Sequence, residues 1–271
     1  MLGAIIGDIA GSRFEWSNIR QKQFQFFKHQ CHVTDDTVMT LAVAKALMEM
    51  TDLNDLTQCA VRNMQELGRK YPYAGYGGRF IEWLAEENPQ PYNSWGNGAG
   101  MRVSPCAWAA KTLEEALQLS DIVTAVTHNH PEGIKGARAV TAAIFLAREG
   151  RSMEEIREHI ETNYYPLDFT LDQIRKTYKF DVSCQGSVPQ ALEAFLESTD
   201  FEDAVRGAIS IGGDSDTIAD MAGAVAEAYW GIPEILRNAG LAFLDAAQLQ
   251  IVQDFEARFG AKLRYEDGEY R

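Results

Sequence analysis

The spacing of the apolar residues is the feature that most limits what this chain can fold into. In the stretches 38–48 and 218–229 apolar residues recur every three or four positions and so line one face of a helix. The alternating pattern of a half-buried strand is scarce, and 178–182 is the one candidate for a short, isolated strand. The chain is therefore predicted to be all-α, a compact helical bundle forming a single domain over residues 1–271.

Local start signals predict where several helices begin. Thr112, Ser152 and Asp200 each precede acidic residues and an apolar run, as helix N-caps do, and Pro131 suits a first turn. The helices at Thr112 and Pro131 are predicted to run to about 126 and 150, and a final helix is predicted over 241–259. The stretch 71–102 is rich in Gly, Pro and aromatic residues and is predicted to be irregular, which is typical of functional loops.

Charge and composition exclude several kinds of partner. The formal net charge is −14, which disfavours non-specific nucleic-acid binding because that binding depends on Lys and Arg. No stretch approaches the ~18 apolar residues of a membrane span. The four cysteines form no CxxC pair, and Asp8 interrupts an N-terminal apolar run that carries no basic residues. We expect a cytoplasmic protein with reduced thiols and no membrane partner.

Two short acidic turns are the strongest local signal, and each precedes an apolar-periodic helix. They read Thr34-Asp35-Asp36-Thr37 and Gly213-Asp214-Ser215-Asp216-Thr217. Asp, Ser and Thr are favoured N-cap residues, so helix capping explains each turn taken alone. If the two turns met in space, their carboxylates would repel one another and would need protons or hard cations between them. Spacing alone leaves capping and a shared metal site both open.

A glycine-rich turn is the second signal, and it reads Trp95-Gly96-Asn97-Gly98-Ala99-Gly100-Met101-Arg102. A turn of this kind before a helix suits phosphate, although it matches neither a dinucleotide fingerprint nor a P-loop, and a plain turn explains it equally well. His128 lies in a His-x-His pair that could contact a ligand or cap the next helix. Glu15, by itself, has the character of an ordinary surface acid.

Taken together and in order, these segments resemble the ADP-ribosylglycohydrolase family. The matching pieces extend over most of the chain and are Gly3-Ala4-Ile5-Ile6-Gly7-Asp8 with Glu15, Thr34-Asp35-Asp36-Thr37, Trp95 to Arg102, Thr127-His128, Ser187-Val188-Pro189 and Gly213-Asp214-Ser215-Asp216-Thr217.

The resemblance implies a magnesium-dependent hydrolase that cleaves the bond between the distal ribose of ADP-ribose and an acceptor, either a protein side chain or a small leaving group. It implies two Mg²⁺ ions, with Mn²⁺ as a possible substitute, held by Thr34, Asp35, Asp36, Asp214, Asp216 and Thr217. The ADP-ribosyl group would contact Ser94, Trp95, Gly96, Asn97, Gly98, Ala99, Met101 and His128. Glu15 or Asp36 would handle the proton, with Glu15 on a loop over the metals.

Two other functions stay open at this point. One is a catalytically silent family member that binds ADP-ribose or serves a structural role, and the other is a metal phosphohydrolase that cleaves the diphosphate. The acceptor is open as well: Glu82, Glu86 and Glu87 could recognise an arginine, or they could be ordinary exposed helix charges.

Overall fold

The computed structural model describes residues 1–260 and confirms the all-α prediction, since this part of the chain contains helices and no strand. Residues 261–271, which the predicted single domain includes, lie outside the described part. The helices are α1 (Leu2–Ser12), α2 (Asp35–Glu49), α3 (Leu56–Lys70), α4 (Gly78–Ala85), α5 (Gly98–Met101), α6 (Ser104–Ala109), α7 (Leu113–Ala125), α8 (Pro131–Arg148), α9 (Met153–Asn163), α10 (Leu171–Ile174), α11 (Cys184–Leu196), α12 (Phe201–Ser210), α13 (Ser215–Trp230), α14 (Glu234–Leu241) and α15 (Ala246–Phe259).

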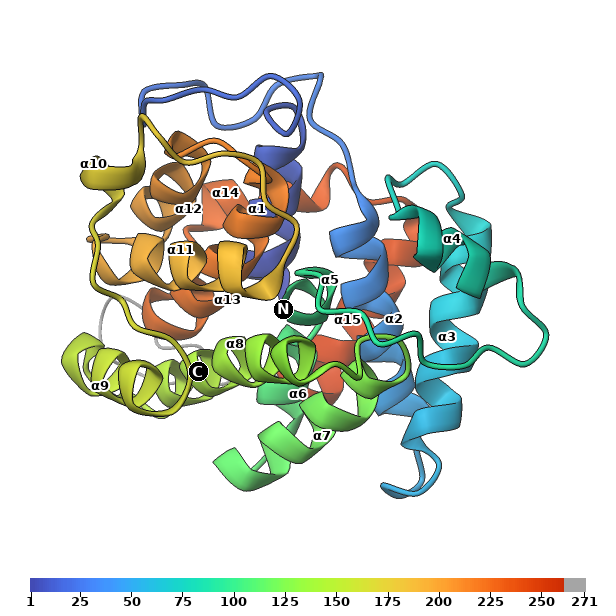
Figure 1. Cartoon of the computed structure of the whole chain (residues 1–271). Helices are drawn as coiled ribbons and strands as arrows, with labels where there is room; N and C mark the ends of the chain where they lie inside the picture. The colour runs from blue at the N-terminus through green and yellow to red at the C-terminus, as the bar shows by residue number, and fades with distance from the viewer. Residues whose placement is uncertain (261–271) are drawn as a thin grey trace.

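The helices form two groups with the short helix α5 between them. In Figure 1, α1 and α11–α14 lie on one side and α2–α4 on the other, and α8 packs against α5, α11 and α13. Helix α13 is the central element: every residue from Ser215 to Glu227 is buried. Because a helix that is buried on all faces has no solvent side, its polar residues must be paired or functional.

Glycines every fourth residue bring the backbones of α1 and α13 into direct contact. A Cβ atom on Gly7 would stand 2.0 Å from the carbonyl oxygen of Ala219, and one on Gly3 would stand 2.3 Å from that of Gly223. Gly11 would meet the Cα atom of Asp216 at 2.5 Å. No side chain larger than hydrogen fits at these positions, so the sequence GxxxGxxxG at 3–11 sets how closely the two helices pack.

The predicted helix starts are confirmed. Thr112 Oγ1 accepts a hydrogen bond from the Glu115 backbone N–H, although the Glu115 side chain turns to the Lys111 amide and leaves the capping box incomplete. Ser152 forms a full capping box with Glu155, and the Asp200 side chain caps α12.

Three predictions of local structure are wrong. The predicted final helix ends at Phe259 as expected but starts at Ala246 rather than at 241, because Asp245 forms a capping box with Gln248, and Leu241 is instead the last residue of α14. The candidate strand at 178–182 is not a strand, and only one isolated bridge, between Gly96 and Ser183, lies beside it. The stretch 71–102 is not irregular throughout, since it contains α4 and α5. Within residues 1–260, no helix is both long and apolar enough to cross a membrane.

The contact between α1 and α13 yields a stability prediction. Gly7→Ala forces a methyl group into the Ala219 carbonyl, so we expect a loss of about 3 kcal/mol and a fall in melting temperature of roughly 5–10 °C. Gly77→Ala is the matched control, because nothing lies within 4 Å of the added atom. Equal melting temperatures for the two variants, measured by circular dichroism, would contradict the close approach.

Candidate metal centre and ligand site

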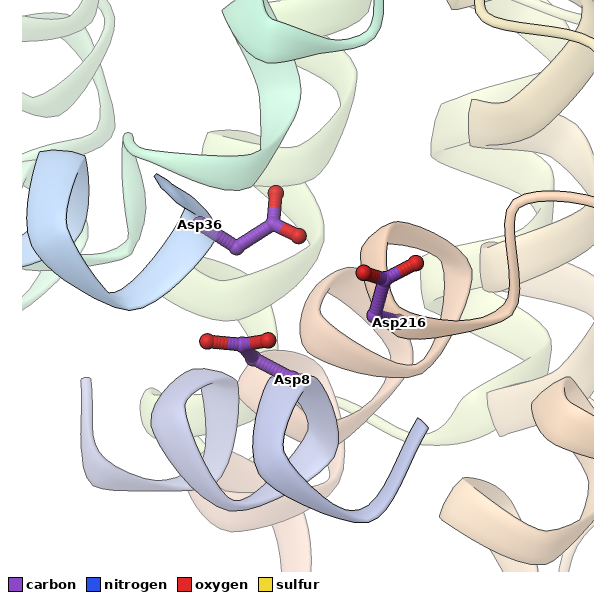
Figure 2. A group of neighbouring side chains, drawn as sticks. All are labelled: Asp8, Asp36 and Asp216. Atoms are coloured by element: carbon purple, nitrogen blue, oxygen red, sulfur yellow. The ribbon is translucent and has the colours of Figure 1, made fainter. Parts of the chain in front are cut away.

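Three buried carboxylates from three helices point toward one another at the centre of the molecule. Asp8 comes from α1, Asp36 from α2 and Asp216 from α13 (Figure 2). Each offers a carboxylate oxygen, and these oxygens lie within 4.8 Å of one another. The Gly7 and Gly11 contacts that draw α1 onto α13 therefore also bring Asp8 to Asp216.

The two acidic turns meet directly. The Thr217 hydroxyl, at the start of α13, lies 3.1 Å from Asp36 Oδ2 and 3.2 Å from Asp36 Oδ1, and it donates to this carboxylate. Capping accounts for Thr34, whose side chain accepts from the Asp36 backbone N–H. It does not account for Asp214, which occupies the N-cap position of α13 without a side-chain cap hydrogen bond. Helix capping therefore does not explain the acidic turn at the start of α13.

Asp8 is the residue that sequence reasoning missed. Its carboxylate accepts hydrogen bonds from the backbone N–H groups of Thr34 and Thr37, each at 3.1 Å, and from both threonine hydroxyls. These bonds hold the first turn of α2 in place and orient Thr34. The signal was present in the sequence, since Asp8 is a lone acid inside a helix that is otherwise apolar or small, but neither that pattern nor the family resemblance assigned Asp8 a role at the site.

A second group of acids adjoins the first. Glu15, Asp214 and Asp216 also bring carboxylate oxygens within 4.8 Å of one another. Glu15 is half-buried and lies in the loop between α1 and α2. Asp35 belongs to neither group; it is half-buried, its backbone N–H donates to the Ala74 carbonyl at 2.8 Å, and its carboxylate faces Gly75.

Burial and mutual repulsion raise the pKa of these acids. Desolvation is the larger cause for Asp36 and Asp216, whose pKa values lie well above the usual range, and neighbouring carboxylates add to it. The same causes raise the pKa of Glu15 and of Asp35 to about 7. Such a group of acids holds together with protons or cations between its members.

Some of the buried carboxylate oxygens have no hydrogen-bond partner within residues 1–260. In α13 these are Asp216 Oδ1 and both oxygens of Asp220, which lies one turn further along the helix. An unpartnered buried oxygen is costly unless something outside the chain satisfies it. Carboxylate and hydroxyl oxygens without Cys or His are the donor set of Mg²⁺, Mn²⁺ and Ca²⁺, so the residues fit a hard divalent cation.

The glycine-rich turn lies against the acidic turn of α13. Asn97 Nδ2 donates to Asp214 Oδ2 at 2.6 Å and to Ser187 Oγ at 3.1 Å. The segment before α11 pairs with this turn, because the Asn97 N–H donates to the Val182 carbonyl and the Cys184 N–H to the Trp95 carbonyl. The contact between Asn97 and Asp214 links the predicted ligand turn to the predicted metal ligands.

The other residues predicted to contact the ADP-ribosyl group differ in their exposure and in their hydrogen bonds. Ser94 Oγ accepts from the Gly96 N–H, and the Trp95 side chain is half exposed. The side chains of Ala99 and Met101 are buried in the core, and their N–H groups donate to Gly96 and Asn97 carbonyls. Several amides of the turn are therefore engaged within the protein.

His128 lies directly beneath the glycines of the turn. A Cβ atom on Gly98 would be 3.2 Å from His128 Nε2, and one on Gly96 would be 3.4 Å from it. Its Nδ1 is 2.7 Å from the Thr127 hydroxyl, and burial lowers the pKa of His128 well below its usual value, so the ring is neutral. His130, the other member of the pair, caps α8 instead by accepting from the Glu132 N–H.

Comparison with known proteins identifies the family. The ADP-ribosylglycohydrolase family model matches residues 1–260. The chain is 26% identical to the ADP-ribosylhydrolase ARH3 of Homo sapiens, over 87% of this chain and 85% of the relative. It is also 26% identical to the ADP-ribosyl-[dinitrogen reductase] glycohydrolase of Rhodospirillum rubrum, over 86% and 85%. The ADP-ribosylarginine hydrolase Tri1 of Pseudomonas putida is 23% identical, over 86% and 70%.

A solved structure titled ADP-ribosylglycohydrolase-related protein complex has the same fold. It superposes with a TM-score of 0.67, covers 95% of this chain and 96% of its own, and is 23% identical in sequence. The predicted resemblance is confirmed by the family model, and the chain belongs to the ADP-ribosylglycohydrolase family.

Proposed function

We propose that this protein hydrolyses the bond between the distal ribose of an ADP-ribosyl group and an acceptor, with Mg²⁺ as its cofactor. The observation that carries the proposal is the meeting of Asp36 with Thr217 beside the unpartnered Oδ1 of Asp216. Family membership supports the reaction class. The names of the relatives support an ADP-ribosylated protein as the partner, and ADP-ribosyl-arginine as the first conjugate to test.

The cations would be held by Thr34, Asp35, Asp36, Asp214, Asp216 and Thr217. When bound, they would orient the distal ribose through its vicinal hydroxyls and offset the charge of the diphosphate. Two ions suit the arrangement, because Asp36 and Asp214 belong to two adjoining groups of acids that share Asp216 and that also include Asp8 and Glu15. Mn²⁺ has the same preference for oxygen ligands and should substitute.

The glycine-rich turn would seat the ADP-ribosyl group. Gly96 and Gly98 let the turn pass close to neutral His128, and half-exposed Trp95 lies between Ser94 and Gly96 in this turn. The Gly98 carbonyl accepts from Arg102 Nε, and several amides of the turn are also bonded within the chain. The Ser94 hydroxyl, which accepts from the Gly96 N–H, is the group best able to exchange that bond for one to the ligand.

Glu15 is the better candidate for moving the proton. Asp36 is fully buried and already accepts from Thr217, whereas Glu15 is half-buried on a loop and its pKa of about 7 suits proton exchange near neutrality. A water beside Glu15 would attack the anomeric carbon as its bond to the acceptor breaks. Glu15 would take a proton from that water and return it to the departing acceptor atom.

Location and domain extent remain predictions. All four cysteines are free and buried, which suits a cytoplasmic protein, and we propose that the whole chain acts as one unit.

The first prediction concerns the products. With Mg²⁺, peptides carrying ADP-ribosyl-arginine or ADP-ribosyl-serine should release free ADP-ribose, and a chelator should abolish turnover. Asp216→Asn should lower kcat/KM at least about 100-fold because it removes a shared ligand, whereas Asp168→Asn, on the exposed surface, should not. Release of AMP would indicate a phosphohydrolase instead. Binding of ADP-ribose without turnover would favour the silent family member.

The second prediction concerns Glu15→Gln. If Glu15 moves the proton, kcat should fall by about 10²–10⁴, while the rise in melting temperature with ADP-ribose and Mg²⁺ should persist. Glu154→Gln, an exposed glutamate in the first turn of α9, is the control. Loss of the metal-dependent rise together with the activity would make Glu15 a metal ligand and would contradict its role as a base.

The third prediction is a pH dependence of stability in the metal-free protein. Folding raises the pKa of Glu15 and Asp35 from about 4 to about 7. Their contribution to stability is therefore fully present below about pH 4 and is lost as the pH rises through about 7. In chelator the melting temperature should fall from pH 5 to pH 8. Saturating Mg²⁺ or Mn²⁺ should reduce that fall, since cations bind the deprotonated acids. Thermal scans with equal slopes in both conditions would count against a metal at these acids.

A further inference from the structure

The side-chain amide of Asn18 joins the loop that carries Glu15 to the turn that carries Asp214. Asn18 Nδ2 donates to the Gly213 carbonyl at 2.9 Å, and the Gly213 N–H donates back to Asn18 Oδ1 at 2.8 Å. Gly213 immediately precedes Asp214 and has a φ of 75°, a left-handed conformation that glycine adopts without strain. These two reciprocal hydrogen bonds join residues that are 195 positions apart in the sequence.

The same amide also reaches the backbone next to the Glu15 side chain. Asn18 Nδ2 lies 2.7 Å from the Phe14 carbonyl oxygen and 3.0 Å from that of Glu15, so its two hydrogens are shared among three acceptors. Asn18 thus contacts the backbone of Glu15 and also Gly213, the residue before Asp214.

We propose that Asn18 is a positioning residue that holds the Glu15 carboxylate beside Asp214 and Asp216. The inference rests on the proposed function, in which Glu15 moves the proton. Glu15 lies in a loop rather than a helix, and the negative charges of Asp214 and Asp216 repel it. Hydrogen bonds to the loop backbone must therefore oppose that repulsion, and the Asn18 amide supplies them to both the Glu15 and the Gly213 carbonyls.

Other contacts keep the rest of this loop in place when Asn18 is removed. Arg20 donates to the carbonyls of Ile211, Arg175 and Tyr178, two residues beyond Asn18. The Trp16 ring stacks on Phe180 with centroids 5.1 Å apart. Asn18→Ala is therefore expected to fold and to lose only the hydrogen bonds that the Asn18 side chain forms with the backbone of 14–15 and of Gly213.

The test is a double-mutant cycle between Asn18→Ala and Glu15→Gln, with ADP-ribosyl-arginine peptide and Mg²⁺. If Asn18 acts through Glu15, Asn18→Ala should lower kcat about tenfold with KM nearly unchanged, and it should have little further effect in the Glu15→Gln background. The rise in melting temperature with ADP-ribose and Mg²⁺ should be retained. Asn163→Ala is the control, because the amide of that exposed asparagine donates to the His159 carbonyl within its own helix.

Hydrogen exchange gives a readout that does not depend on turnover. The Gly213 amide, which donates to Asn18 Oδ1, and the amides of 15–18 should exchange faster in Asn18→Ala and not in Asn163→Ala. Unchanged exchange there, an unchanged kcat, or an equal fall in kcat in both backgrounds would each overturn the proposal. A wild-type protein without turnover would instead refute the proposed function, and hydrogen exchange would still decide whether Asn18 holds the loop.

Discussion

The backbone contact between α1 and α13 is the constraint on which the rest of this structure depends. Gly3, Gly7 and Gly11 let α1 lie against α13 with no side chain between them. Two helices at that separation place Asp8 next to Asp216, and Asp8 then fixes the first turn of α2 through its bonds to Thr34 and Thr37. One packing contact thus assembles three helix segments around a common centre.

The same contact creates an electrostatic cost that hydrogen bonds to Asp8 and Asp36 relieve only in part. Asp8, Asp36, Asp216 and Asp220 are all buried, and burial raises the pKa of each. Apolar residues at such positions would cost less, since burying a charged group destabilises the folded state, and Asp216 Oδ1 and both Asp220 oxygens have no partner within residues 1–260. The retention of these acids at the meeting point of the helices is the physical argument for a cation there, because a divalent ion turns the repulsion into attraction.

The site combines rigid and adjustable parts. The proposed metal ligands start helices whose first turns are buried, so their positions follow from the packing of the core. Glu15 sits on a loop that depends on side-chain hydrogen bonds to keep its place. This division suits a reaction in which the ligands must stay fixed while the proton-carrying group exchanges with solvent. Asn97 connects the proposed ligand-binding turn to the proposed metal ligands, because its side-chain amide donates to Asp214.

The sequence by itself determined the helical class and most helix starts, because apolar period and N-cap chemistry act over a few residues, as at Ser152 and Asp200. The start of the last helix was placed too early, at 241, although Asp245 and Gln248 carry the capping signal that starts α15 at Ala246. The family likeness pointed to residues of the centre, yet it did not single out Asp8. Only the tertiary structure decided that Thr217 meets Asp36 across 181 positions and that Asp8 supports Thr34. Such contacts depend on how closely whole helices approach, and no local pattern encodes that distance.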